Sequence, residues 1–401
     1  MLHHGAVRVA VAGGPWREFA GTFPGPRVAV RFSDTATFLS CVLDPELRFG
    51  EAYVDGRLEI VEGDLEGFLH LARLNTRAAA ASNPFPRLLR GVRGVRSRVR
   101  SRGARDVRHA YDLKEELFQL LLDPDRQYSC AYFTTPEDSL EQAQERKKLR
   151  LAAKLFLRPG QRVLDIGSGW GGLGLYLANL ERVDVDGVTL SQMQYDASVK
   201  RAAQAGLAGR VRFHLRDYLD VQGKYDRIVS VGMLEHLGGH QHGAYFGKIA
   251  DLLSDDGVAV IHFIARYSGA APVNPWLDRY IFPGGFLPSL KLVMDAVERT
   301  SLLVTDVEVM RLHYAETLKA WRKRLHANRA RIREMYDDRF IRMWDFYLTA
   351  CEMVFRTGQA MVLQLQLAKS QLALPLTRDY IREFEDSNHP RNALRITGTS
   401  D

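Results

Sequence analysis

From residue 161 onwards, short apolar runs alternate with stretches whose apolar residues recur at helical spacing. The apolar runs span residues 162–166, 183–188, 210–215, 226–231 and 257–264, and the helical stretches lie near 171–180, 192–206 and 242–253. Such alternation is typical of right-handed βαβ units, in which helices cover both faces of a parallel sheet. The sequence therefore predicts an α/β fold with a mostly parallel, doubly wound sheet.

The regions on either side of this pattern predict added helices and a separate small domain. Residues 302–310 indicate a further strand, and two long helices are expected over 315–336 and 340–369. Residues 1–82 combine short β-like runs with a helix around 64–73, which favours a small N-terminal α+β domain. A chain of 401 residues leaves room for roughly two or three domains.

The positive charge of the chain is concentrated in one segment. The chain has 55 Lys and Arg against 48 Asp and Glu, a net charge of +7. Residues 83–109 contain nine arginines and a single acid, so this segment carries +8 and the rest of the chain carries −1. Its apolar residues include a set at helical spacing, namely Leu88, Val92, Val95 and Val99. The segment is therefore either an interfacial amphipathic helix attracted to anionic lipid or a flexible charged linker.

Composition excludes several other classes of protein. With 46% hydrophobic and 26% charged residues, the chain is an ordinary globular protein and not a disordered or fibrous one. Cys41, Cys130 and Cys351 are too few and too scattered for a disulfide framework or a cysteine-based zinc site, which favours the reducing cytoplasm. No apolar run approaches the roughly 18 residues of a membrane span, and the N-terminus lacks the apolar core of a signal peptide. Any membrane contact is therefore expected from the surface.

A glycine-rich loop follows the first strand of the α/β region. Residues 162–166 lead directly into Gly167-Ser-Gly-Trp-Gly-Gly172, where glycines allow a sharp turn and close approach to a ligand. Gly167, Gly169 and Gly172 also satisfy the spacing of a dinucleotide site, so the glycines alone leave that alternative open. Asp165 would repel a pyrophosphate but could hold an ammonium group, which favours S-adenosylmethionine.

Several segments resemble the cyclopropane-fatty-acyl-phospholipid synthase family. The matching segments are 128–133, 163–172, 187–191, 226–236, 280–285, 313–318 and 346–352. Residues 44–53 are similar to the N-terminal domain of the longer bacterial members. The resemblance implies a Rossmann-like class I methyltransferase domain over residues 110–401, preceded by an N-terminal accessory, lipid-docking domain (1–82) and an Arg-rich linker (83–109). It also implies a homodimer.

The resemblance assigns the contacts to S-adenosylmethionine by position. The implied residues are Tyr128 and Ser129 over the methionine moiety, Asp165, Gly167 and Gly169 beside it, Thr189 and Gln194 at the ribose, and Asp217 and Tyr218 at the adenine. The family usually has Glu at position 193 and Arg at position 219. This chain has Met193 and Leu219 there, so the adenosine side matches less closely.

The implied reaction is the addition of a methylene group across a cis double bond. An isolated double bond is a poor nucleophile, and methyl transfer to it builds positive charge on carbon. The site therefore needs a dry apolar slot, groups that stabilise the cation and a base that removes a proton from the transferred methyl group. Ring closure then gives a cyclopropane, whereas loss of a different proton gives a methylene-branched chain.

In this family the implied base is a bound bicarbonate. The residues implied to hold it are Cys130, Glu235, His262, Ile264 through its backbone N–H, and Tyr314. Taken singly, His262 in Val-Ile-His-Phe-Ile is also typical of a core histidine, and Cys130 of a small buried residue. Cys351 matches a family cysteine sometimes considered catalytic, but the reaction needs no covalent enzyme intermediate and an apolar helix favours a core position.

The same sequence features also suit other functions. A relative could methylate the same double bond without closing the ring, giving methyl- or methylene-branched lipid, and an inactive lipid-binding homologue is a further alternative. A nucleic-acid enzyme would suit nine arginines, but that segment lacks interleaved aromatic residues for base stacking. His236, His240 and His242 fit no zinc-ligand spacing, so no metal is predicted.

The predicted partners follow from this chemistry. They are unsaturated phospholipid acyl chains at an anionic membrane surface, and no nucleic acid. The protein is therefore expected in the cytoplasm, peripheral on the inner face of the membrane.

Overall fold

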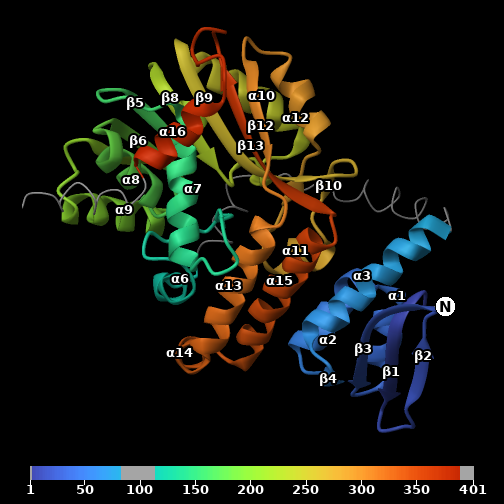
Figure 1. The fold of residues 1–401 in the computed structure, drawn as a ribbon. Helices are drawn as coiled ribbons and strands as arrows, with labels where there is room; N and C mark the ends of the chain where they lie inside the picture. The colour runs from blue at the N-terminus through green and yellow to red at the C-terminus, as the bar shows by residue number, and fades with distance from the viewer. Residues whose placement is uncertain (1, 83–112, 389–401) are drawn as a thin grey trace, which may run out of the picture. The chain divides into compact units, whose positions relative to one another are not determined.

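The computed structural model describes residues 2–82 and 113–388, so the Arg-rich segment 83–109 lies outside the described residues (Figure 1). The chain divides into two compact units. The accessory unit consists of the described residues of Met1–Arg102, Ala271–Gly285 and Ala315–Ala360. The sheet unit consists of the described residues of Gly103–Ala270, Phe286–Tyr314 and Met361–Asp401.

The N-terminal part of the accessory unit has the α+β character that the sequence predicted. Its four-stranded sheet has the order β2-β1-β3-β4, with β1 His4–Val11, β2 Arg17–Ala20, β3 Phe23–Phe32 and β4 Leu58–Glu62. Helices α1 Thr35–Leu43, α2 Pro45–Val54 and α3 Leu65–Ser82 accompany the sheet. In β3, Val28, Ala29, Val30 and Phe32 are buried and Arg31 is exposed, so the strand is buried on both faces around Ala29 and on one face at its end.

Two later segments group with these N-terminal residues. They contain β10 Ala271–Pro272, α11 Pro275–Tyr280, most of α13 His313–Ala327, α14 Arg329–Met335 and α15 Asp338–Arg356. Polar contacts join them to α2: the hydroxyl of Tyr280 donates to Glu51 Oε1 (2.8 Å), and the hydroxyl of Tyr53 donates to Asp345 Oδ2 (3.0 Å). The compact units therefore cut across the predicted domain 110–401.

The sheet unit contains a seven-stranded sheet of order β12-β13-β9-β8-β5-β6-β7. Its strands are β5 Arg162–Ile166, β6 Asp184–Thr189, β7 Val211–Leu215, β8 Tyr225–Val231, β9 Leu253–Arg266, β12 Leu303–Val309 and β13 Ala360–Ala368. β5 pairs in parallel with β6 and β8, β6 with β7, and β8 with β9, whereas β12 and β13 are antiparallel. The predicted mostly parallel, doubly wound sheet is confirmed, and the strand order reverses beside β5.

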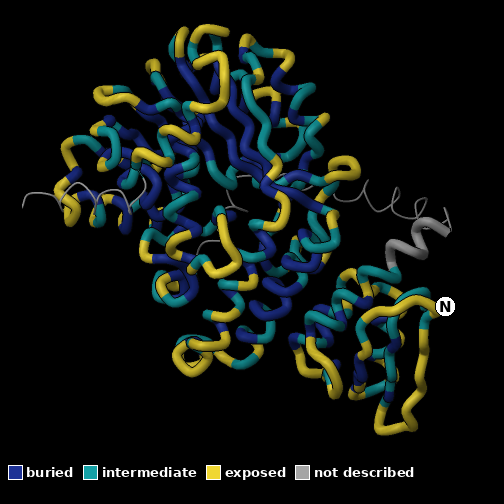
Figure 2. The backbone as a smooth tube through the Cα atoms, viewed as in Figure 1, coloured by how far each residue is buried: buried dark blue, intermediate teal, exposed yellow. Residues whose placement is uncertain are grey.

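Helices cover both faces of this sheet, and its central strands are buried (Figures 1 and 2). The covering helices are α7 Leu140–Leu155, α8 Gly172–Glu181, α9 Gln192–Gln204, α10 His242–Leu252, α12 Leu290–Val297 and α16 Asp379–Ser387, and the short α6 Glu115–Leu121 lies away from the sheet. One apolar cluster joins the sheet to α10 and α12 through residues such as Phe246 and Val293. The other joins it to α7 and α8 through residues such as Leu151 and Leu177.

The predicted long helix over 340–369 is wrong in its second half. Helix α15 ends at Arg356, and Gly358 adopts a φ of +67°, which reverses the chain. Residues 360–368 then form β13, every residue of which is buried. Residues 363–367 alternate Leu with Gln, which is a strand pattern that the prediction did not use. The strand is nevertheless buried on both faces, because Gln364 and Gln366 have hydrogen-bond partners in the interior.

Helix α7 begins with side-chain capping of its first turn. A capping box joins Ser139 and Gln142 there, with both reciprocal hydrogen bonds. Helix α6 begins at Glu115. In the described ranges, no helix is both long and apolar enough to cross a membrane.

Candidate active site

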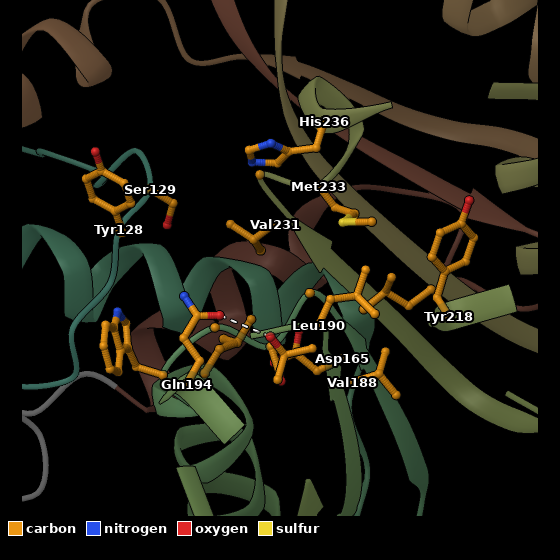
Figure 3. Close-up of a pocket in the computed structure, with 18 of the residues that line it drawn as sticks. Tyr128, Ser129, Asp165, Val188, Leu190, Gln194, Tyr218, Val231, Met233 and His236 are labelled. Atoms are coloured by element: carbon orange, nitrogen blue, oxygen red, sulfur yellow. Dashed lines mark hydrogen bonds between the residues drawn. The ribbon is translucent and has the colours of Figure 1, made fainter. Parts of the chain in front are cut away.

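A cavity lies at the carboxyl ends of β5, β6 and β8, beside the reversal in strand order (Figure 3). This is where doubly wound sheets bind ligands. Its lining includes eight of the nine predicted cofactor residues: Tyr128, Ser129, Asp165, Gly167, Gly169, Thr189, Gln194 and Tyr218. In Figure 3, Tyr128 and Ser129 lie at one end of the cavity and Tyr218 lies at the other.

The glycine loop takes a backbone path that other residues would strain. Gly167 and Gly169 have φ values of +79° and +53°, in the left-handed region that favours glycine. At Gly172, the first residue of α8, an added Cβ would lie 2.3 Å from the carbonyl oxygen of Asp125. The glycines thus allow both the turn after β5 and the close approach of the segment that leads to Tyr128.

Thr189 and Gln194 fix each other beside the cavity. The Thr189 hydroxyl donates to Gln194 Oε1 (3.0 Å) and accepts from the Ser191 N–H (3.2 Å). Ser191 also caps α9 by accepting from the Gln194 N–H. These bonds leave the amide nitrogen of Gln194 directed toward the cavity in Figure 3. The pair is therefore arranged to offer a donor to a ligand hydroxyl.

Asp165 is a buried carboxyl group in the cavity wall. Its side chain is 2% exposed, and its Oδ2 has no hydrogen-bond partner in the part of the chain that is described. Burial raises the pKa of Asp165 to about 7, and the charge of Lys147 opposes that rise. A buried carboxyl oxygen without a partner favours a cationic group of a ligand in that place.

Asp217 does not line the cavity. Its carboxylate accepts the N–H of Leu219 (2.9 Å) and caps the short 3-10 helix Tyr218–Asp220. The neighbouring Tyr218 does line the cavity, as does Arg216 on the other side of Asp217. The structure thus gives Asp217 a local role in turning the chain so that Tyr218 faces the ligand.

Several lining residues were missed in the sequence. They are Arg126, Trp170, Arg216, Met233 and His236. Met233 is the N-cap residue of a short 3-10 helix after β8, Leu234–His236, and His236 is the last residue of that helix. A position at the carboxyl end of a central parallel strand was a usable signal for these two, because such positions border the ligand site. Trp170 belongs to the glycine loop itself, so its position was also available from the sequence. Arg126 is brought there by tertiary packing, with its guanidinium 5.4 Å from the Trp170 ring centre.

Glu235 lies on that same 3-10 helix. Its Oε1 accepts the backbone N–H of Ile264 in β9 (2.6 Å), and its buried Oε2 has no hydrogen-bond partner in the described ranges. Burial raises the pKa of Glu235 to about 7, against the lowering effect of its backbone hydrogen bonds. Because the Ile264 N–H already serves Glu235, it is not free to hold an anion unless the carboxylate shares or releases it.

His262 is a buried, uncharged histidine in β9. It is 2% exposed, and its Nδ1 lies 3.3 Å from Nε2 of Gln364 in β13. Burial lowers the pKa of His262 to about 3, with the positive charges of Lys147 and Lys154 acting in the same direction. The β8–β9 register pairs His262 with Val231, a residue that lines the cavity. His262 is therefore a neutral hydrogen-bonding group near the cavity wall.

Cys130 and Tyr314 are both buried and lie on two segments joined by a hydrogen bond. The Phe133 N–H donates to Nδ1 of His313, the residue before Tyr314 (3.1 Å). Cys130 follows Tyr128 and Ser129 directly in the sequence. The structure therefore connects the segment that lines the cofactor cavity to the start of α13.

Cys351 belongs to α15 in the accessory unit and not to the sheet unit that contains the other candidate residues. Burial raises the pKa of the Cys351 thiol to about 12. A thiol in that state is protonated at neutral pH and is a poor nucleophile. The histidines near Glu235 form no potential metal site: within residues 2–82 and 113–388, no three His, Cys, Asp or Glu side chains are grouped as metal ligands would be.

Comparison with known proteins adds evidence from outside the chain. The model of the family described as mycolic acid cyclopropane synthetase matches residues 98–365. The chain is 35% identical to the cyclopropane-fatty-acyl-phospholipid synthase of Escherichia coli K12, over 85% of this chain and 87% of that protein. It is 32% identical to a probable fatty acid methyltransferase of Pseudomonas putida, over 89% of this chain and 92% of that protein.

A solved structure agrees with these relatives. The mycolic acid cyclopropane synthase solved in complex with SAH and CTAB is 32% identical and superposes with a TM-score of 0.63. It covers 67% of this chain and 99% of the solved chain. The fold and the sequence therefore point to the same group of proteins.

Proposed function

Because the chain belongs to the mycolic acid cyclopropane synthetase family of S-adenosylmethionine-dependent methyltransferases, we propose that it acts on the cis double bonds of unsaturated acyl chains in membrane phospholipids and closes a cyclopropane ring. The observation that carries the proposal is the unpartnered Oε2 of Glu235, a buried carboxyl oxygen beside the cofactor cavity. Such an atom favours a bound group or a proton in transit.

The cofactor cavity suits S-adenosylmethionine. When bound, this cofactor supplies a methyl group on a positively charged sulfur. Asp165 offers the carboxylate for the ammonium group, and Thr189 and Gln194 offer the polar atoms for the ribose. Tyr128 and Ser129 would cover the methionine end, and Tyr218 would lie beside the adenine.

The region of Glu235 suits a bicarbonate. When bound, this ion supplies a base for the proton of the transferred methyl group. Neutral His262 and buried Tyr314 carry donor groups for an anion, and Glu235 can take up a proton. The Cys130 thiol donates to the Ala131 carbonyl (3.3 Å) and would have to turn to meet the ion. A bicarbonate could meet the Ile264 N–H only with a shift of the Glu235 carboxylate, since that N–H donates to Glu235.

The experiment that tests the function uses purified protein, methyl-labelled S-adenosylmethionine and vesicles of cis-unsaturated phosphatidylglycerol. We expect labelled lipid whose proton NMR spectrum has the upfield signals of a cyclopropane methylene. Label in RNA and not in lipid would overturn the proposal. An olefinic methylene signal in place of the ring signal would favour the alternative, a lipid methyltransferase that forms branched chains, which the name of the Pseudomonas putida relative leaves open.

We also propose that the protein works as a homodimer on the inner, anionic face of the membrane, with residues 83–109 supplying the attraction. Nine arginines in this segment support the proposal, because each basic residue near an anionic surface contributes about 1 kcal/mol of attraction. Neutralising Arg93, Arg96, Arg98 and Arg100 should abolish sedimentation with phosphatidylglycerol vesicles at low salt. Unchanged sedimentation would contradict the proposal, and light scattering would test the dimer.

A further inference from the structure

Helix α7 holds the segment Gln127–Ser129 against the cofactor cavity at four points. The Gln144 side chain donates from Nε2 to the backbone carbonyls of Gln127 (3.3 Å) and Ser129 (2.9 Å). One turn further along α7, the Lys147 ammonium donates to Gln127 Oε1 and to Ser129 Oγ (3.1 Å). The same two residues are thus held through both backbone and side chain, and Tyr128 between them lines the cavity.

Lys147 is an unusual group to find in this place. Its side chain is 0% exposed, and both of its hydrogen-bond acceptors are neutral oxygen atoms. Burial lowers the pKa of Lys147 to about 8, against the attraction of Asp123 and Asp165. Burying an ammonium without a carboxylate in contact is costly, so a purely structural lysine would be better placed in an ion pair.

A second lysine on the same helix shows that alternative. Lys154 lies seven residues along α7 and is also 0% exposed. Its ammonium lies 2.6 Å from Glu308 Oε2 and 3.3 Å from Asp306 Oδ2 of β12, away from the cofactor cavity. The two lysines are matched in helix and burial, and they differ in what they contact.

The charge of Lys147 also acts on the groups around the cavity. It lowers the pKa of Asp165 and is the one charged group that acts on that carboxyl group in the described structure. Besides burial, Lys147 and Lys154 both lower the pKa of His262. Ser129, which Lys147 contacts, is followed directly by Cys130, so the ammonium lies beside residues that were assigned to the cofactor site and to the base site.

We propose that Lys147 is a positioning residue of the cofactor site. Its ammonium holds Gln127 and Ser129 so that Tyr128 and Ser129 cover the methionine end of S-adenosylmethionine, and its positive charge favours the ionised form of Asp165. The inference rests on the proposed cofactor site. It adds to that site a residue that holds the lining segment in place and does not touch the reacting atoms.

The test measures binding of S-adenosylhomocysteine by calorimetry from pH 6 to 9 in the full-length wild type, Lys147→Met, Lys147→Gln and Lys154→Met. Lys147→Met removes both hydrogen bonds and the charge, whereas Lys147→Gln removes the charge and keeps an N–H donor on a side chain that is one atom shorter. We expect at least a tenfold loss of affinity in Lys147→Met at pH 8 and a smaller loss in Lys147→Gln. In both variants the pH midpoint of binding should move upwards, because Asp165 loses the charge that favours its ionisation.

Lys154→Met is the matched control, and we expect its affinity to stay within threefold of the wild type and its pH midpoint to stay unchanged. Lys147→Met that binds within twofold of the wild type, with an unmoved midpoint, would overturn the inference. An equal loss in Lys154→Met would also overturn it, because the effect would then be that of any buried lysine. If Lys147→Met does not fold, Lys147→Gln decides through its midpoint. A wild type that does not bind S-adenosylhomocysteine would instead refute the proposed cofactor site.

Discussion

The cofactor cavity and the region around Glu235 each bury a carboxyl group with a pKa of about 7, but they leave it in different states. Asp165, at the end of β5, lies among glycines and has the charge of Lys147 behind it. Glu235, after β8, has one oxygen fixed by the Ile264 N–H and the other without a partner in the described residues. Two carboxyl groups with a similarly raised pKa therefore have different surroundings.

This difference suggests that Asp165 serves to bind the cofactor and Glu235 serves in the reaction. A carboxylate in a cavity that fits a cationic ligand contributes to affinity, because the ligand satisfies it on binding. A carboxyl group aimed by one hydrogen bond, with a pKa near the working pH, is arranged to exchange a proton. Changes at Asp165 should thus alter cofactor binding, and changes at Glu235 should alter turnover.

The largest effect is expected for Glu235→Gln, which keeps the size of the side chain and removes its ability to take up a proton. We expect kcat to fall by about 10²- to 10⁴-fold, the usual contribution of a positioned acid or base. Affinity for S-adenosylhomocysteine should stay close to that of the wild type, measured by calorimetry on the same preparation. Near-normal turnover would show that Glu235 takes no part in the reaction, and its role would then not differ from that of Asp165 in the way proposed.

Asp165→Asn should show the opposite pattern. Losing one charge-assisted contact costs about 1.5–3 kcal/mol, so we expect a loss of affinity of about tenfold to a hundredfold for S-adenosylhomocysteine. Saturating cofactor should restore much of kcat. If affinity is retained while kcat falls, the assignment of Asp165 to recognition is wrong.

The pH dependence sharpens the same comparison. The pKa of Asp165 is raised to about 7, so the empty protein holds this carboxyl group partly protonated at neutral pH. A cationic ligand prefers the ionised form, and its affinity should fall about tenfold per pH unit below pH 7 and level off between pH 7 and 8. Above pH 8, loss of the Lys147 charge, whose pKa is about 8, should weaken binding again. Titration of wild type and Asp165→Asn at several pH values checks this, since the variant should show a flat profile below pH 8.

Both fold and site could be predicted where local sequence determines them. The strands β5 to β8 and the glycine loop were located to within about a residue, because parallel strands between helices leave strong apolar runs and glycine marks the turn. β13 was missed although the Leu–Gln alternation of residues 363–367 and the glycine at position 358 both favour a strand that follows the end of a helix. The contacts of Lys147, in contrast, could not be predicted from local sequence, since the lysine lies 20 positions from Gln127 and only folding brings them together.

A pair of glycine variants tests the close backbone approach at the cofactor loop. Gly172→Ala would place a Cβ 2.3 Å from the Asp125 carbonyl, so the segment before Tyr128 must shift. We expect a loss of about 1–3 kcal/mol in the free energy of unfolding and weaker cofactor binding. Gly243→Ala in α10 is the control, because nothing lies within 4 Å of the added Cβ and alanine favours a helix by about 1 kcal/mol. Similar thermal stability of the two variants would contradict the close approach at Gly172.

The smallest effect is expected for Cys351→Ser. This variant tests whether the Cys351 thiol takes part in the reaction beside the two carboxyl groups. Burial holds the pKa of Cys351 at about 12, so the thiol stays protonated at neutral pH. Methyl transfer to a double bond needs no enzyme nucleophile, and turnover should change by no more than about twofold. Thermal stability should fall slightly, because a hydroxyl is costlier to bury than a thiol. A loss of kcat comparable to that of Glu235→Gln, with the fold intact by circular dichroism, would place a reacting group in the accessory unit, and the reaction could then no longer be assigned to the sheet unit alone.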